Sequence, residues 1–331
     1  MKIPVRSILY AAFFLSGGTS LVLEVCWFKE LSYLLGNSLH AVASVAAGFM
    51  GGLCLGSVLA ARIARDVRFP LRVYALLQLA IGLCGAVSIV VFRSTSPWLT
   101  WIYQNLSGEP GLFVATRFAV VLLLMLLPVT LMGMTLPVVV GASGRARIRY
   151  DLDAGGLYGV NTLGAVAGTM LASFLLVPGF GLLRTTLVIG IVDVCIGIMV
   201  FALHRGAGAA LAAPPTEKTA AVSAGQPWMI GAAVAVAGAA GLILEVTWFR
   251  LLALTVGPTV HTFAVMLAVF LAGIGLGSVA EATVFRRWNL PGRTLLTTFM
   301  ASAGLLAVLG LFYINHLPLW FDGLFRHALE R

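Results

Sequence analysis

Long apolar segments separated by short polar loops make up most of this chain. About 20 mainly apolar residues in an α-helix are enough to cross the roughly 30 Å hydrocarbon core of a bilayer. The pattern predicts nine such helices, over roughly 8–35, 40–62, 71–92, 112–136, 154–177, 184–203, 228–254, 260–284 and 294–314. The predicted fold class is therefore an all-α polytopic membrane protein.

Two shorter segments are amphipathic rather than continuously apolar. The first, 96–103, carries Trp98, Trp101 and Tyr103 and is too short to span. The tail 315–331 has a similar composition. Because Trp and Tyr favour the membrane–water interface, both segments are expected to lie along that interface.

Composition excludes the main alternatives to a membrane protein. Of the 331 residues, 60% are hydrophobic and only 10% are charged, whereas soluble domains carry about 25% charged residues. Disorder requires low hydrophobicity and high net charge, so it is excluded for the chain as a whole. The net charge of +9 is spread over loops between apolar runs, which argues against nucleic acid as the partner and for the lipid bilayer.

The distribution of basic residues predicts the orientation. With the N-terminus inside, fourteen Lys and Arg lie in cytoplasmic segments and five lie outside. The cytoplasmic set is Lys2, Arg6, Arg62, Arg65, Arg68, Arg72, Arg145, Arg147, Arg149, Arg205, Lys218, Arg286, Arg287 and Arg293, and the outer set is Arg93, Arg117, Arg184, Arg326 and Arg331. Cytoplasmic loops of membrane proteins carry this excess. The predicted location is the bacterial inner membrane, with a cytoplasmic N-terminus and, after nine crossings, an external C-terminus.

An internal repeat relates the two ends of the chain. Residues 21–58 align without gaps to residues 242–279, a shift of 221 positions, with 17 identities in 38 pairs. The shared motif is Leu-Glu-Val-x-Trp-Phe-Lys/Arg, and self-similarity at this level indicates duplication. Both copies cross the membrane in the same direction, as in the parallel repeat of major-facilitator transporters.

The repeat predicts the domain organisation. Residues 1–203 form a first six-helix half, 204–227 a flexible cytoplasmic linker rich in Ala, Gly and Pro, and 228–314 the first three helices of a second half. A twelve-helix transporter would have three further helices. We therefore expect either that this chain is a fragment or that a partner supplies the remainder.

The repeat places the same three polar side chains at the outer ends of both halves. Glu24, Trp27 and His40 correspond to Glu245, Trp248 and His261. Glu24 lies about 24 Å along its helix, near the outer edge of the hydrocarbon core, and Trp27 lies on the same helical face. One interpretation is a substrate or cation site in which paired carboxylates and indoles receive an ammonium group. The alternative is that each Glu locks a helix junction.

Two further polar residues are expected near the middle of the membrane. Asp193 lies about nine residues into the sixth predicted helix, and Asn161 lies at a similar depth in the fifth. We expect these two side chains to hydrogen-bond. Asp193 would then be either a protonated structural residue or a carrier of coupling protons.

Pairs of glycines four residues apart recur in several of the predicted helices. They are formed by Gly48, Gly52 and Gly56, by Gly164 and Gly168, and by Gly273 and Gly277. This spacing lets helix backbones approach closely, so these residues are expected to pack against other helices.

Motifs for catalysis, cofactors and metals are missing from the sequence. It contains no Gly-x-Gly-x-x-Gly after a strand, no phosphate-binding Walker loop, no His-Glu-x-x-His and no Cys/His cluster. No stretch between the apolar segments is long enough for a soluble enzyme domain. We therefore predict no catalytic residue, no cofactor and no metal within this chain.

Several motifs together resemble one family, the membrane (major-facilitator-like) region of bacterial spermidine-synthase-like proteins, also described as fused major-facilitator/spermidine synthases. The motifs are the repeated Leu-Glu-Val-x-Trp-Phe-Lys/Arg, Met-Gly-Met-Thr-Leu-Pro at 132–137, Tyr-Gly-Val-Asn-Thr-Leu-Gly-Ala-Val-Ala-Gly at 158–168 and Pro-Gly-Phe-Gly-Leu at 178–182. The resemblance extends to about Phe285. It implies a link to polyamines and, usually, an attached aminopropyltransferase domain. This sequence contains no such domain, so the resemblance assigns no catalytic residue.

Three functional interpretations follow. The first is a non-catalytic membrane module with a polyamine-related role in transport, as an anchor or as a partner of a spermidine-synthase-like subunit. The second is an independent secondary transporter of an organic cation. The third is a structural membrane assembly protein in which the paired motifs only hold helices together.

Overall fold

The computed structural model describes residues 5–35, 39–63, 69–141, 154–206, 227–257, 259–283, 292–314, 316 and 319–320, and these are helical apart from short turns. Backbone polar groups cannot bond to water inside a bilayer, so an apolar chain of this kind satisfies them within helices. Seven helical stretches are long and apolar enough to cross a membrane: Arg6–Leu35, Ala43–Ile63, Pro70–Leu106, Pro110–Val140, Gly155–Arg205, Gly231–Val256 and Val260–Ser278. The prediction of an all-helical, multi-pass membrane protein is confirmed.

The nine predicted segments all fall on these helices or on one shorter apolar helix. Segments 154–177 and 184–203 share the 51-residue stretch Gly155–Arg205. A straight helix of that length would be about 77 Å long, more than twice the thickness of the hydrocarbon core. The ninth segment coincides with α11 (Gly292–Ile314), whose apolar part is Thr297–Gly310. The predicted linker and the tail fall mostly outside the described residues.

The long stretch is divided near Gly181. It comprises α7 (Ala154–Leu171), the π-helical turn η1 (Ala172–Leu176) and α8 (Val177–Gly206). Gly181 has a φ of 75°, a left-handed conformation that favours glycine and that interrupts α8. The Thr185 hydroxyl donates to the Leu176 carbonyl across this break, at 3.1 Å. The chain thus folds back between the two predicted crossings.

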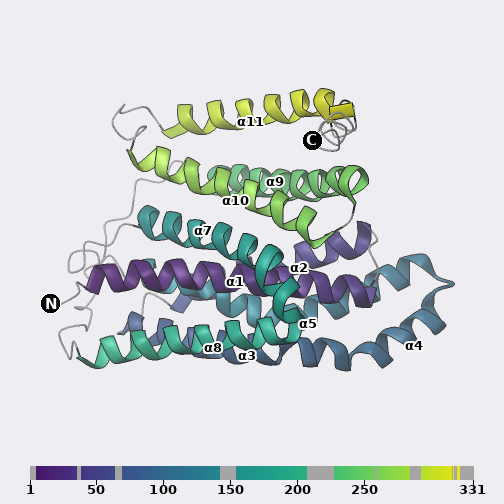
Figure 1. Cartoon of the computed structure of the whole chain (residues 1–331). Coiled ribbons are helices and arrows are strands. Elements are labelled where there is room, and N and C mark those ends of the chain that lie inside the picture. The colour runs from purple at the N-terminus through teal and green to yellow at the C-terminus, as the bar shows by residue number, and fades with distance from the viewer. Residues whose placement is uncertain are drawn as a thin grey trace, which may run out of the picture. The chain divides into compact units, whose positions relative to one another are not determined.

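The first compact unit comprises residues 1–219 together with 267–279. Besides α7, η1 and α8, it contains α1 (Val5–Leu35), α2 (Leu39–Ile63), α3 (Pro70–Ser94), α4 (Ser96–Leu106) and α5 (Pro110–Gly141). The helices pack mainly in pairs, α1 with α7, α2 with α5 and α3 with α8. Figure 1 shows α3 and α8 side by side along most of their length.

Glycines allow each of these pairs to approach closely. A Cβ added to Gly17 of α1 would overlap the Asn161 carbonyl of α7, and one added to Gly56 of α2 would overlap the Thr130 carbonyl of α5. A Cβ on Gly82 of α3 would lie 2.5 Å from the Gly190 carbonyl oxygen of α8. Backbone contact of this kind is how small residues hold helices together in membranes.

The predicted packing role of the glycine pairs is confirmed in part. Added Cβ atoms on Gly52, Gly164 and Gly168 would also clash with the neighbouring helix. Around Gly273 and Gly277 of α10 (Val260–Thr283) there is nothing within 4 Å among the described atoms. Among the described residues, the spacing therefore marks close packing in α2 and α7.

The second compact unit comprises residues 220–266 and 280–331. It holds α9 (Pro227–Val256), the beginning of α10 and α11. Gly257, with a φ of 103°, makes the turn between α9 and α10, and the Thr262 hydroxyl donates to its carbonyl at 2.8 Å. Phe249 of α9 meets Phe263 of α10 edge to face, with their ring centroids 5.6 Å apart.

Candidate functional site

Glu24 and Trp27 are both buried on α1. The Glu24 side chain is 4% exposed, and the Trp27 indole is fully buried. Trp27 Nε1 donates to Ser88 Oγ of α3 at 2.8 Å, and its ring lies 6.1 Å from that of Phe92. The indole therefore makes its polar and its aromatic contact with α3.

Glu245 and Trp248 occupy corresponding places on α9. Glu245 is also 4% exposed, and its Oε2 atom has no hydrogen-bond partner among the described residues. The half-buried Trp248 faces α11, where an added Cβ on Gly310 would lie 2.9 Å from the indole ring. In each copy of the motif, then, the indole packs against the second helix further along the chain, α3 for Trp27 and α11 for Trp248.

Of the two histidines of the motif, only His261 has a side chain that the structure describes. His40 is the second residue of α2, and its side chain lies outside the described residues. His261 is the second residue of α10, with an exposed side chain. Each therefore opens a helix as expected, and the assembly of Glu, Trp and His into one site stays a prediction.

The expected hydrogen bond between Asn161 and Asp193 is wrong. Asn161 Nδ2 donates to the Phe13 carbonyl of α1 at 3.0 Å. Asp193 Oδ1 instead accepts from the Thr19 hydroxyl of α1 at 2.6 Å. Both polar residues are thus bonded to α1, because that helix packs against both α7 and α8.

Asp193 belongs to a buried polar cluster that the sequence analysis did not identify. Tyr74 and Gln78 of α3 are fully buried, and the Gln78 amide donates to the Tyr74 hydroxyl at 2.9 Å. Ser16 on α1 is a further hydrogen-bonding neighbour of Tyr74. Gln78 was the available signal, since it is an uncharged polar residue in the middle of an apolar helix, one turn from Tyr74.

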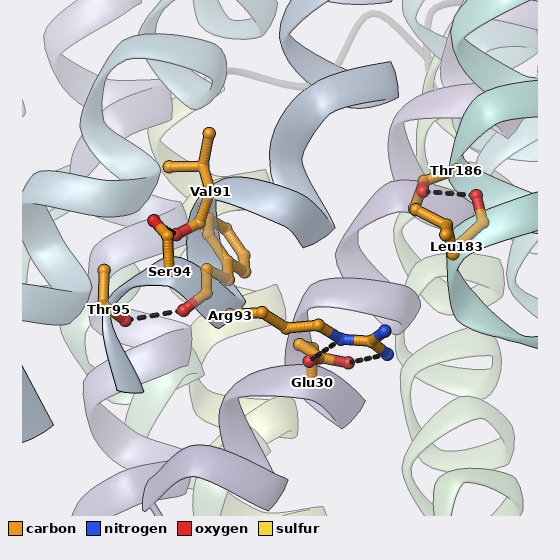
Figure 2. A network of polar contacts seen from close by, with 8 residues as sticks. Glu30, Val91, Arg93, Ser94, Thr95, Leu183 and Thr186 are labelled. Atoms are coloured by element: carbon orange, nitrogen blue, oxygen red, sulfur yellow. Dashed lines mark hydrogen bonds and ion pairs between the residues drawn. The ribbon is translucent and has the colours of Figure 1, made fainter. Parts of the chain in front are cut away.

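A second polar contact that was missed joins α1 to α3 nearer their ends. Arg93 Nε lies 2.7 Å from Glu30 Oε1, and Arg93 Nη2 lies 3.2 Å from Glu30 Oε2, an arrangement that Figure 2 shows. The Glu30 side chain is 5% exposed and that of Arg93 is 55% exposed. The buried carboxylate is therefore paired by both arms of a guanidinium that reaches the surface.

A half-open cavity of about 500 Å³ lies where the end of α1 meets α4 and the start of α5. Its polar lining comprises Ser96, Thr100, Tyr103, Gln104 and Arg117, and its apolar lining Leu34, Leu35, Leu99 and Phe113. The Arg117 guanidinium donates to the Leu35 carbonyl and lies 4.9 Å from the Phe113 ring centroid. The guanidinium in this cavity thus already contacts other groups of the protein. Within the part of the chain that the structure describes, no three His, Cys, Asp or Glu side chains gather as a metal site.

The helices and their buried polar contacts define the class of this protein as a multi-pass, all-helical membrane protein. Comparison with curated proteins adds a relationship to enzymes of polyamine chemistry. The chain is 27% identical to polyamine aminopropyltransferase 1 of Streptomyces coelicolor over 206 residues, which is 61% of this chain and 35% of that protein. It is 25% identical to polyamine aminopropyltransferases 2 and 1 of Ralstonia nicotianae, each over 193 residues and 58% of this chain.

The relationship is distant and partial. The matched region is about a third of the length of these relatives, 34–35% in all three. No family model matches the chain. No solved structure matches it. What the comparison establishes is a membrane region related to polyamine aminopropyltransferase proteins.

Proposed function

We propose that this chain is the non-catalytic membrane module of a spermidine-synthase-like protein and serves a polyamine system in transport, as an anchor or as a partner of the enzyme. The observation that carries the proposal is the partial match, in which most of an apolar helical chain aligns with about a third of polyamine aminopropyltransferases. Aminopropyl transfer would then be the work of a part of the system outside the matched region.

The positions of the helices support a two-half, major-facilitator-like arrangement. Shifting α1, α2 and α3 by the 221 positions of the repeat gives the ends of α9, α10 and α11 to within one residue. The shift also relates Trp27, which packs on α3, to Trp248, which packs on α11. Duplicated helices with duplicated neighbours are what a parallel repeat requires.

Charge supports the proposed location. Fourteen basic residues in the segments assigned to the inside, against five outside, favour a cytoplasmic N-terminus in the bacterial inner membrane. A cytoplasmic enzyme domain or subunit would then meet this module on its more basic side.

Purification from native membranes tests the proposal. The tagged chain would be extracted in mild detergent, and the chains that accompany it in stoichiometric amount would be identified by mass spectrometry. We expect an aminopropyltransferase, either as a partner or on the same polypeptide, and a changed ratio of spermidine to putrescine in cells lacking the gene. A similarly tagged, unrelated multi-pass protein is the control. Isolation without the enzyme and with unchanged polyamines would overturn the proposal.

The second candidate function is an independent secondary transporter of an organic cation. Two buried glutamates at equivalent places favour it, Glu24 on α1 and Glu245 on α9, and Oε2 of Glu245 accepts no hydrogen bond from the described residues. An ionisable side chain within a membrane helix costs roughly 2.5–3.5 kcal/mol at the helix centre, so its presence suggests a function. The structural assembly role is the third candidate.

Neutralising both glutamates separates these candidates. Uptake of radiolabelled spermidine and putrescine into proteoliposomes would be compared for the native chain, the double variant Glu24→Gln/Glu245→Gln and the control Glu109→Gln, whose residue is exposed before α5. Lost uptake with unchanged thermal stability supports a transporter, and lost folding supports the locking role. If the native chain takes up neither polyamine, transport of these two organic cations is rejected.

A further inference from the structure

The polar cluster in the core of the first unit lies where three helices meet. α1 contributes Ser16 and Thr19, α3 contributes Tyr74 and Gln78, and α8 contributes Asp193. All five side chains are less than 5% exposed. A carboxylate here is removed from water on every side, so its charge must be balanced locally.

Two acceptor atoms of the cluster lack a hydrogen-bond donor among the described residues. The single Thr19 proton serves both Asp193 Oδ1, at 2.6 Å, and the Ser16 carbonyl, at 3.0 Å. The Tyr74 hydroxyl is directed to the Ala12 carbonyl at 3.5 Å, the upper limit for such a bond. Asp193 Oδ2 and Gln78 Oε1 receive no hydrogen bond from the described residues. Two buried oxygen atoms are therefore left without a positive partner.

The neighbouring side chains do not supply the missing charge. Asp193 accepts a hydrogen bond from the Thr19 hydroxyl, and no Lys, Arg or His side chain among the described residues forms an ion pair with it. The Arg93–Glu30 pair is at the other end of α3, about 15 residues and thus ~22 Å along that helix from Gln78. A buried carboxylate that has no basic side chain beside it must be neutralised by a cation bound from solution, either a proton or a metal ion.

The packing around the cluster restricts what can enter. Gly82, one turn beyond Gln78, meets Gly190, close to Asp193, at backbone distance. The Tyr74 ring is fixed on its other side by Phe13, stacked with a centroid distance of 4.9 Å. An ammonium group with its carbon chain does not fit between helices in such contact, and a divalent ion would not be balanced by one carboxylate.

We propose that Asp193, Gln78, Tyr74 and Thr19 form a binding site for one monovalent inorganic cation, H⁺ or Na⁺. The shared chemistry is a single positive charge received by oxygen atoms, with Asp193 Oδ2 and Gln78 Oε1 as the principal acceptors and the two hydroxyls beside them. Either ion would remove the cost of the unpaired carboxylate. This proposed cation site does not depend on whether the module acts as a transporter or as an anchor.

The sodium arm of the test measures thermal unfolding of the purified chain in detergent. Its Tm would be followed as NaCl replaces choline chloride at constant ionic strength, with KCl as a second comparison. A ligand that binds only the folded state raises Tm with its concentration. If the ion is Na⁺, we expect Tm to rise by about 2–4 °C or more with sodium and to be insensitive to sodium in Asp193→Asn. Glu109→Gln, which alters an exposed carboxyl, keeps the native response.

The proton arm measures the carboxylic C=O stretch in infrared spectra, assigned to Asp193 as the band that Asp193→Asn lacks. If the ion is H⁺, the band disappears as the pH rises, and Gln78→Leu shifts the frequency because it removes the second unpartnered oxygen of the cluster. Should Asp193→Asn fail to fold, the native chain and Gln78→Leu still decide between the ions. The proposal is overturned if Tm ignores sodium and no carboxylic band assigned to Asp193 changes with pH, or if the sodium effect persists in Asp193→Asn.

Discussion

The indole Nε1 of Trp27 donates a hydrogen bond to Ser88 Oγ at 2.8 Å and so joins α1 to α3. Ser88 in turn donates to the Gly85 carbonyl at 2.7 Å, within its own helix. Because Nε1–H is the only donor of a tryptophan side chain, this bond satisfies the indole completely. In this contact Trp27 holds two helices together, which agrees with a structural role for the motif. Any cation-binding role of the motif would then depend on the glutamates.

Replacing Ser88 by Ala should destabilise the protein by about 1–3 kcal/mol, since the buried indole N–H would lose its acceptor. The free energy of unfolding in detergent, followed by tryptophan fluorescence, measures this effect. Ser94→Ala is the matched control, because Ser94 lies on the same helix, is exposed and donates to the Val91 carbonyl within that helix. Equal stabilities of the two variants would show that the Trp27–Ser88 bond contributes nothing.

The Glu30–Arg93 pair should respond unequally to loss of its two members. Arg93→Met leaves the Glu30 carboxylate buried without a partner, whereas Glu30→Gln leaves a half-exposed guanidinium that water can solvate. We expect Arg93→Met to lower Tm more than Glu30→Gln, with a cost of about 1.5–3 kcal/mol for the bonds to the charged group. Arg93→Lys should restore part of the loss, since it keeps the charge but not the forked geometry. A larger loss for Glu30→Gln contradicts this ordering.

Gly56 and Gly277, which lie 221 positions apart in the sequence, should differ in their tolerance of a side chain. A Cβ on Gly56 would overlap the Thr130 carbonyl and lie 2.9 Å from the Gly133 Cα, whereas Gly277 has open space. Gly56→Ala should therefore destabilise by about 1–3 kcal/mol through overpacking. Gly277→Ala should change stability little or raise it by up to about 1 kcal/mol, through the helix preference of Ala over Gly. Thermal unfolding of both variants tests the pair, and a comparable loss for Gly277→Ala would be the contrary result.

The sequence predicted the helices well because their signal is local. Hydropathy and length locate apolar segments without knowledge of neighbours, and α4 was expected as a separate short helix because segment 96–103 is too short to span. The glycine spacing likewise predicted close packing at Gly52 and Gly164, because the motif describes one helix face. Such features depend on a single segment of chain.

Partners across helices were harder to predict. Counting residues gives the depth of Asp193 and Asn161 in the membrane, but not the direction in which each side chain faces. Both contact α1, through Thr19 and the Phe13 carbonyl, since α7 and α8 pack on it after the chain folds back near Gly181. The three-helix cluster around Asp193 follows from that packing, and no pattern within one helix contains it.

The proposed orientation predicts which loops are reachable from outside the cell. In a cysteine-free background, Ser107→Cys, between α4 and α5, should react with a membrane-impermeant maleimide in intact cells. Arg205→Cys, at the end of α8, should react only after the membrane is permeabilised. Both positions are exposed in the structure, so access depends on the side of the membrane rather than on burial. The background protein without cysteine is the control for non-specific labelling. The reverse pattern would place the N-terminus outside, contrary to the charge bias, and the ends of α1 and α9 that carry Glu24 and Glu245 would then face the cytoplasm.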